Sequence, residues 1–189
     1  MPAPKILVMS GSIRTGSHNT RLAALATKEL TLLDADVTRI SLQDYPLPLY
    51  DAEHDAREGQ PASALQLKHM IMAHHGVFIA SPEYSASVTP LLKNAIDWVS
   101  RAYPAAWRGK PGLLLSAAPS PVGGNRGAWA ARVPLEVTGA ILHPDVFSLP
   151  AADKAFDETG ALTDAKMAAR LDKVVAGFVA FAGALAKRA

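Results

Sequence analysis

Short apolar segments alternate with segments of helical spacing along the whole chain. Two of the apolar segments, 76–81 and 112–118, are apolar at nearly every position, which is typical of strands covered on both faces. Five strands are predicted: 5–10, 35–41, 76–81, 112–118 and 140–149. Because a helix is predicted after each strand, the pattern indicates an α/β fold with a parallel sheet and helices on both faces.

The helices are predicted from apolar residues that recur every three or four positions. They cover 19–33, 62–74, 90–100, 126–139 and 164–187. Pro90 suits the first turn of its helix, whereas Pro134 lies inside a helix and predicts a kink or a later start. Pro144 interrupts the last strand, which suits a strand at the edge of the sheet. Residues 42–61, rich in proline and acidic residues, are predicted to form a long connection.

Length and composition narrow the functional classes. The 189 residues suffice for one domain with a full core, so residues 1–189 are predicted to form a single domain. A formal charge of +2 is too small to indicate a nucleic-acid partner. The absence of cysteine excludes disulfides and thiolate metal sites, and the six histidines show no metal-ligand spacing. No segment has the roughly 18 apolar residues of a membrane span and none resembles a signal peptide, so a cytoplasmic protein without membrane partners is expected.

Parallel sheets of this kind bind ligands beyond the carboxyl ends of their strands, where the strand order reverses. Three predicted loops lie at such ends: the first loop (10–19), the second loop (81–89) and the third loop (116–126). The binding site is therefore predicted where these three loops meet.

The first loop, SGSIRTGSHN, carries more hydrogen-bond donors than a turn requires. Its polar side chains include those of Ser12, Arg14, Thr15, Ser17 and Asn19. A helix is predicted to begin at the end of this loop, and the free N–H groups at a helix start favour an anion. Hydroxyls, an amide and a guanidinium can add hydrogen bonds to phosphate oxygens.

Two common phosphate motifs do not fit this loop. Gly11 and Gly16 have the spacing of a Walker loop. Ser17 and His18, however, stand where that motif has lysine and a hydroxyl residue, and the G-x-G-x-x-G dinucleotide pattern is absent. What remains is a single terminal phosphate, held mainly by hydroxyls and amides. In the alternative, Ser17 only caps the helix and Arg14 is solvated.

The second loop is stiffened by Pro82 and contains no glycine. Its backbone amides and the ring of Tyr84 suit the edge of a planar ligand, with packing of Tyr84 against a neighbouring subunit as the alternative. For Glu83 we favour a structural ion pair with a basic group such as Arg101, because a bare carboxylate would repel an anionic ligand ring. Any ligand contact of Glu83 is expected through its backbone.

The third loop contains Gly123 and Gly124. Two residues without side chains allow the flat face of a ligand to approach closely and leave their amides free to donate. The alternative is a simple left-handed turn before the next helix.

Together, the three loops resemble those of the NAD(P)H-dependent FMN reductase family, the flavodoxin-like group that includes chromate, quinone and azobenzene reductases. GSIRTGSHN is similar to the family's GS-x-R-x-x-S-x-N phosphate loop, SPEYSASVTPLLKNAIDW to its PEY loop and following helix, and GGNR to its third loop. FDETGALTD, ahead of the last helix, is similar to the family as well. The resemblance implies a flavodoxin-like, doubly wound sheet of five parallel strands in the order 2-1-3-4-5 that binds FMN.

By this resemblance, the FMN phosphate is held by Ser12, Arg14, Ser17 and Asn19, with Thr15 in the same loop. The isoalloxazine ring is lined by Pro82, Glu83, Tyr84, Ser85, Ser116, Gly123 and Gly124. No catalytic side chain is assigned. Ser85 stands where the family usually has asparagine, and Ala117 and Ala118 stand where serines are common, so affinity for FMN or for the second substrate is expected to differ.

The resemblance also implies a function, in which hydride passes from NADPH or NADH through flavin N5 to a quinone, an azo dye, a nitroaromatic compound, chromate or a similar small molecule. The alternatives are a non-enzymatic FMN-binding electron carrier or redox sensor, or a structural partner that has lost flavin. Electron carriers of this fold are commonly strongly acidic, and a charge of +2 counts against that alternative. Neither the physiological acceptor nor the preferred nucleotide follows from the sequence.

A homodimer or homotetramer is expected from the same resemblance. Tyr45 and Tyr50 make the 42–61 connection apolar enough for contact with a second subunit, with packing on its own domain as the alternative.

Overall fold

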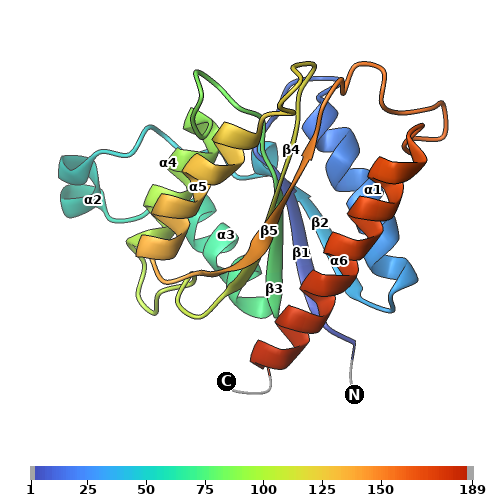
Figure 1. Cartoon of the computed structure of the whole chain (residues 1–189). Coiled ribbons are helices and arrows are strands. Elements are labelled where there is room, and N and C mark those ends of the chain that lie inside the picture. Colours follow the sequence, from blue (N-terminus) through green and yellow to red (C-terminus); the bar gives the residue numbers. More distant parts are fainter. Residues whose placement is uncertain (1–2, 187–189) are drawn as a thin grey trace.

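Five parallel strands form one sheet at the centre of the molecule (Figure 1). The computed structural model describes residues 3–186. The strands are β1 (Lys5–Ser10), β2 (Asp36–Ser41), β3 (Gly76–Ala80), β4 (Pro111–Ala117) and β5 (Ile141–Leu149). They lie in the order β2-β1-β3-β4-β5, and each neighbouring pair is parallel. The predicted α/β sheet and its strand order are confirmed.

The helices are α1 (His18–Leu32), α2 (Ala52–Glu58), α3 (Ala62–Ala73), α4 (Pro90–Ser100), α5 (Asn125–Val137) and α6 (Ala165–Ala186). All five predicted helices are present, and Lys187, the predicted end of the last one, lies outside the described residues. The short helix α2 and the 3-10 turn η1 (Leu42–Asp44) occupy the segment predicted to be a plain connection. Asp51 begins α2 by accepting a hydrogen bond from Glu53 N–H at 2.8 Å. Because α2 buries no side chain, it has no apolar periodicity from which it can be predicted.

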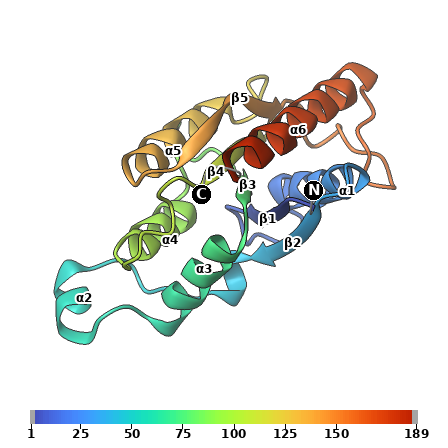
Figure 2. The same ribbon diagram turned by 90° about the horizontal axis from the view of Figure 1, so that it is seen from below.

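The sheet separates two apolar cores, one on each face. Helices α1 and α6 cover one face, and α3, α4 and α5 cover the other, as the view from below shows (Figure 2). Neighbouring residues of a strand belong to opposite cores: Val8 and Phe78 pack with α1 and α6, whereas Leu7 and Val77 pack on the other side. Burial on both faces explains why these strands are apolar at successive positions.

Two prolines lie inside regular elements. Pro134 is within α5, which begins at Asn125, so the later start that the prediction allowed is wrong. Pro144 is in β5, at the edge of the sheet, as predicted. The pairing of β4 with β5 shifts register between Gly112 and Leu114, so the residue without an N–H lies in an irregular part of an edge strand.

Part of the 42–61 connection packs against α4 of the same chain. The side-chain N–H groups of Asn94 and Trp98 both donate to the backbone oxygen of Pro48, each at 2.8 Å. The Tyr50 ring meets Trp98 edge-on, with 5.0 Å between ring centroids. The alternative of packing within the chain is therefore confirmed for this part of the connection, whereas contact with a second subunit stays a prediction.

No helix within residues 3–186 is long and apolar enough to cross a membrane. No group of three His, Asp or Glu side chains in the same range is arranged to hold a metal ion.

Candidate functional site

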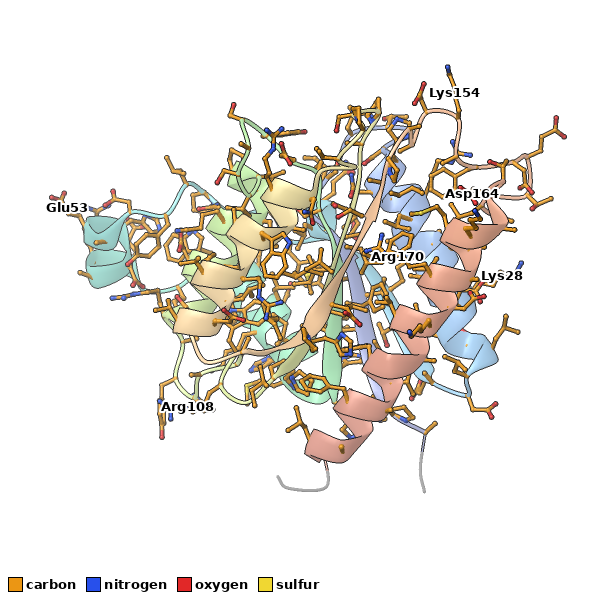
Figure 3. All side chains as sticks on the ribbon, in the orientation of Figure 1. Lys28, Glu53, Arg108, Lys154, Asp164 and Arg170 are labelled. Atoms are coloured by element: carbon orange, nitrogen blue, oxygen red, sulfur yellow. The ribbon has the colours of Figure 1, made fainter. Side chains whose placement is uncertain are left out.

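The first, second and third loops meet at the carboxyl edge of the sheet, uppermost in Figure 1. They follow β1, β3 and β4, which are neighbours in the sheet, so three segments far apart in the sequence come together. Figure 3 shows Lys154 at this end of the molecule and Arg108 at the opposite end. The loops meet where the sequence predicts a binding site.

The first loop ends at the start of α1, where several hydrogen-bond donors have no acceptor. Ser17 is the N-cap of α1 and only 2% exposed, but its hydroxyl makes no capping hydrogen bond. The first hydrogen bond of the helix runs from Arg21 N–H to the Ser17 carbonyl oxygen, at 3.1 Å. The intervening N–H groups of His18, Asn19 and Thr20 have no backbone partner among the described residues. A buried hydroxyl and free N–H groups at one helix start are the arrangement that binds an anion.

The tip of the first loop faces a hollow shared with the second loop. Arg14 and Thr15 are exposed, and the Arg14 guanidinium donates to the Thr15 carbonyl oxygen at 3.4 Å. A cavity of about 340 Å³ is lined by Gly11, Ser12, Ile13, Arg14, Tyr84, Thr89, Pro90 and Leu91. The structure thus brings Ser12, Arg14 and Tyr84, all predicted to contact a ligand, to one hollow.

The start of α1 carries a positive local potential. His18 Nδ1 is buried without a hydrogen-bond partner. Burial, together with the charges of Arg14 and Arg21, lowers the pKa of His18, while Asp153 opposes this shift. His18 is therefore neutral at pH 7, and the two guanidinium groups that disfavour its protonation stabilise an anion at this helix start.

Asn19 joins the first loop to the third. Its side-chain Nδ2 donates to the Ala117 carbonyl oxygen at 2.8 Å, and its Oδ1 accepts from Ala117 N–H at 2.9 Å. The side chain is only 2% exposed, and both ends of its amide serve this bridge. The structure therefore gives the Asn19 side chain a positioning role beside β4, and the phosphate contact that the resemblance implies is left to the Asn19 backbone N–H, which has no backbone partner among the described residues.

The second loop closes in a two-residue turn with an unusual backbone. Tyr84 and Ser87 exchange N–H to carbonyl hydrogen bonds in both directions, at 3.1 and 2.9 Å. Between them, Ser85 and Ala86 have φ angles of 50° and 60°. A turn with two positive φ angles favours Asn-Gly, because the Cβ of other residues crowds the backbone there. The turn holds Tyr84 at the surface, 51% exposed, with Pro82 two residues before it.

Glu83 forms the predicted ion pair, but with a different partner. Its Oε1 accepts a hydrogen bond from Arg126 Nε at 2.8 Å, and its Oε2 accepts one from Gly127 N–H at 3.2 Å. Arg101 instead pairs with Asp55, at 3.4 Å. Arg101 is wrong as the partner because it lies at the far end of α4 from the second loop, whereas Arg126 lies in the first turn of α5.

The two glycines of the third loop form a left-handed turn before α5, as the alternative expected, and their contact with a ligand stays a prediction. Gly123 and Gly124 have φ angles of 62° and 80°. A Cβ on Gly123 would lie 2.6 Å from the backbone carbon of Leu149, and the Gly123 N–H donates to the Ser120 carbonyl oxygen at 3.0 Å. The expectation that both amides are free is therefore wrong for Gly123. Gly124 packs on Ser116, whose Cβ lies 3.2 Å from the position a Gly124 Cβ would take.

Ser116 serves the interior of the protein. It is fully buried, and its hydroxyl donates to Ser148 Oγ at 2.9 Å. Ser148 Oγ in turn donates to Asn125 Oδ1 at 3.2 Å. These bonds tie the end of β4 to β5 and to the first residue of α5, so the hydroxyl that the resemblance places against a ligand ring is committed elsewhere.

Thr89, which the sequence did not single out as a site residue, joins the first two loops. Its Oγ1 donates to the Gly11 carbonyl oxygen at 3.0 Å and accepts from Leu92 N–H at 3.3 Å, so it also caps α4. Thr89 directly precedes Pro90, and a hydroxyl residue before a first-turn proline is a sequence signal for a helix cap. That signal predicts the cap but not the bond to Gly11.

Comparison with known proteins identifies the family. The sequence matches the NADPH-dependent FMN reductase family over residues 4–154. The chain belongs to this family. An Escherichia coli quinone reductase is 33% identical over 163 residues, 85% of each chain, and an NAD(P)H-dependent FMN reductase of Pseudomonas aeruginosa is 34% identical over 165 residues, 86% of each chain. The solved structure of FerB, a flavoenzyme NAD(P)H:(acceptor) oxidoreductase from Paracoccus denitrificans, has a TM-score of 0.82 at 29% identity, with coverage of 96% of this chain and 98% of that one.

Membership of the NADPH-dependent FMN reductase family confirms the predicted enzyme class and cofactor: the chain is an NAD(P)H-dependent oxidoreductase that uses FMN. The family contradicts the alternative of a non-enzymatic electron carrier. A flavodoxin of Pseudomonas aeruginosa, at 17% identity and a TM-score of 0.55, shares the fold alone. The residues present fit FMN, because the buried Ser17 hydroxyl and the free N–H groups after it lack the acceptor that a phosphate supplies.

The positive φ angles of the second loop lead to a stability prediction. Ser85→Asn/Ala86→Gly introduces residues that tolerate a left-handed backbone, so the double variant should raise the free energy of unfolding by about 1 kcal/mol. Ala130→Gly, at a helical position of α5, is the control and should lower it by about 1 kcal/mol. Urea unfolding of the FMN-free protein compares the variants. A double variant less stable than the parent would show that this turn is not strained.

Proposed function

We propose that this chain is an NAD(P)H-dependent reductase of quinones that holds FMN on its three loops. FMN held there would supply the hydride-transfer chemistry between NAD(P)H and the acceptor. The choice of quinones is supported by the relatives whose names specify them. The residues of the chain then have two tasks: to hold the phosphate and ring, and to leave one ring face open to both substrates.

The observation that carries the proposal is the helix start at α1. We assign the FMN phosphate to the buried Ser17 hydroxyl, to the free N–H groups of residues 18–20, and to Ser12 and Arg14 at the neighbouring hollow. A doubly charged phosphate supplies acceptors for all of these donors and is favoured by the helix dipole. Thr15, exposed at the tip of the loop, is assigned a peripheral contact.

The second and third loops are assigned to the flavin ring. Tyr84 lines the hollow, Pro82 and Ser85 belong to the same loop, and Gly124 has an N–H without a backbone partner among the described residues. We assign no side chain to proton transfer. The Glu83 carboxylate is held by Arg126 and Gly127 N–H, and His18 Nδ1 is buried.

A second hollow favours a flat, uncharged acceptor. It measures about 320 Å³ and shares Ile13 and Leu91 with the first hollow. Its remaining walls are Leu42, Gln43, Tyr45, Pro46, Leu47, Asn94 and Ala95. No charged side chain lines it, and a charged acceptor would lose hydration there without gaining a partner. Quinones therefore suit it better than chromate, and azo dyes and nitroaromatics share the flat shape.

A panel of acceptors tests this preference for quinones over chromate. The FMN-loaded protein, with NADPH or NADH in excess, should reduce a benzoquinone with the highest kcat/KM, an azo dye and a nitroaromatic compound with lower values, and chromate with the lowest. Steady-state assays under identical conditions measure the order. A kcat/KM for chromate equal to that for the quinone would contradict the assignment of the second hollow.

The phosphate assignment is tested with two flavins. Arg14→Ala/Ser17→Ala should weaken FMN binding by about 100-fold or more, because hydrogen bonds to a charged group contribute about 1.5–3 kcal/mol each. Riboflavin, which lacks the phosphate, should bind this variant and the parent equally. Arg108→Ala, at the opposite end of the molecule (Figure 3), is the control. Flavin fluorescence titration of FMN-free protein measures each affinity, and an unchanged FMN affinity in the double variant would refute the assignment.

We also infer that the chain forms a homodimer, or a homotetramer built from it, through the side that carries α2. Helix α2 buries none of its side chains and stands away from the body of the molecule in Figures 1 and 2. Leu49, before α2, is 82% exposed, and Tyr103, after α4, is 94% exposed. Arg101, two residues before Tyr103, pairs with Asp55 of α2, so both segments adjoin this helix. Large apolar side chains this exposed are typical of a surface that another subunit covers.

Light scattering at micromolar concentration tests this inference. The mass should be two or four times the chain mass of 19.9 kDa. Leu49→Asp/Tyr103→Ser should lower it by placing charged and polar groups in the contact, whereas Leu32→Ser, at an exposed position of α1, should not. A monomeric parent protein would refute the contact.

A further inference from the structure

We propose that Glu83 is a positioning residue for the flavin site: its carboxylate clamps the second loop to the start of α5, and this clamp sets how the two loops hold the ring. The proposal rests on the proposed function, since it requires FMN on these loops. Glu83 itself is given no contact with the reacting atoms.

The start of α5 has no capping side chain of its own. Its N-cap is Gly124, in the left-handed conformation with a φ of 80°. The N–H groups of the first turn need an acceptor from elsewhere. Glu83 supplies one from the second loop, because its Oε2 accepts a hydrogen bond from Gly127 N–H at 3.2 Å. A carboxylate at this position also interacts favourably with the positive end of the helix dipole.

The other carboxylate oxygen is held by Arg126. Glu83 Oε1 accepts from Arg126 Nε at 2.8 Å and lies 2.5 Å from Arg126 Nη2. The Glu83 side chain is 9% exposed, so the acidic end of the pair is the buried one. Burial alone would raise the pKa of Glu83, but the hydrogen bonds from Arg126 and Gly127 N–H, with the charge of Arg126, outweigh it and lower the pKa. Glu83 is therefore ionised at neutral pH with its charge already paired.

The contact between the two loops leaves no space for adjustment. A Cβ on Gly127 would lie 2.7 Å from Glu83 Cα and 2.9 Å from the Ser87 carbonyl oxygen. Ser87 closes the turn that presents Tyr84, and Gly124 lies against the backbone of Glu83 on the other side. A shift of the Glu83 backbone would therefore move the backbone of Tyr84 or Gly124, the two residues assigned to opposite loops around the ring, and the carboxylate contacts with Arg126 and Gly127 oppose such a shift.

The pairing also removes an electrostatic conflict. A free carboxylate between these loops would repel a ligand that gains negative charge. With Arg126 and the start of α5 on its two oxygens, Glu83 can join the loops without opposing such a ligand.

Two matched substitutions separate the clamp from a general loss of an ion pair. Glu83→Gln keeps the side-chain length and an oxygen acceptor for Gly127 N–H, but loses the charge that holds Arg126. Glu136→Gln makes the same change on α5, at an exposed carboxylate that pairs with Arg132 at 2.6 Å, away from the three loops. Each variant loses the charge of one carboxylate that pairs with an arginine, and only the first loses the clamp.

The readouts are the affinities of FMN-free protein for FMN and for riboflavin, by fluorescence titration, and the visible circular dichroism of the flavin at saturating FMN. Glu83→Gln should lower the affinity for FMN and the affinity for riboflavin by the same factor, about tenfold, because both ligands have the same ring contacts. It should also change the visible dichroism, which reports on the ring environment at full occupancy. Glu136→Gln should leave all three readouts as in the parent.

Wild-type affinities and dichroism in Glu83→Gln would overturn the clamp and leave the FMN site untouched. Failure of the phosphate assignment has a different signature, normal FMN binding by Arg14→Ala/Ser17→Ala, and does not alter the comparison of Glu83→Gln with Glu136→Gln. If Glu83→Gln does not fold, Arg126→Lys replaces it in the experiment. This variant keeps the positive charge but loses the planar guanidinium, so it should lower the affinity for both flavins. Parent-like affinities in Arg126→Lys would overturn the clamp equally.

Discussion

The common direction of the five strands is the constraint on which the rest of the structure depends. Parallel strands must be joined by crossovers, and right-handed crossovers bring the loops that follow β1, β3 and β4 to one edge of the sheet. The crossover through α1 covers one face, the crossover through α3 covers the other, and the strand order reverses between β1 and β3. The position of the site next to this reversal follows from topology before any polar side chain is considered.

Polar contacts then fix the loops relative to one another. Asn19 joins the first loop to the third, Thr89 joins the first to the second, and Glu83 joins the second to Arg126 at the end of the third. Since each loop is held by the other two, none can shift alone. A site that is already ordered loses less conformational entropy when a ligand binds, which is how residues without any catalytic group can serve a reaction carried by a cofactor.

The sheet could be predicted from the sequence because burial on both faces produces apolar runs such as those of β3 and β4. The place of the site could be predicted because parallel strands bring their carboxyl ends to one edge of the sheet. The sequence did not suffice for the roles of individual polar residues. The partner of Asn19 is 98 residues away, and the partner of Ser116 is 32 residues away, so no local pattern records either contact. Helix α2 was not predicted because its only sequence signals are the residues that cap its ends, and it has no buried apolar face.

Reduction of the bound cofactor tests the central claim most directly. Protein loaded with FMN, kept free of oxygen and mixed with NADPH or NADH, should lose the visible absorbance of oxidised flavin and regain it when a quinone is added. A loaded protein that stays oxidised with both nucleotides would contradict the claim that these three loops build the site of an NAD(P)H-dependent reductase.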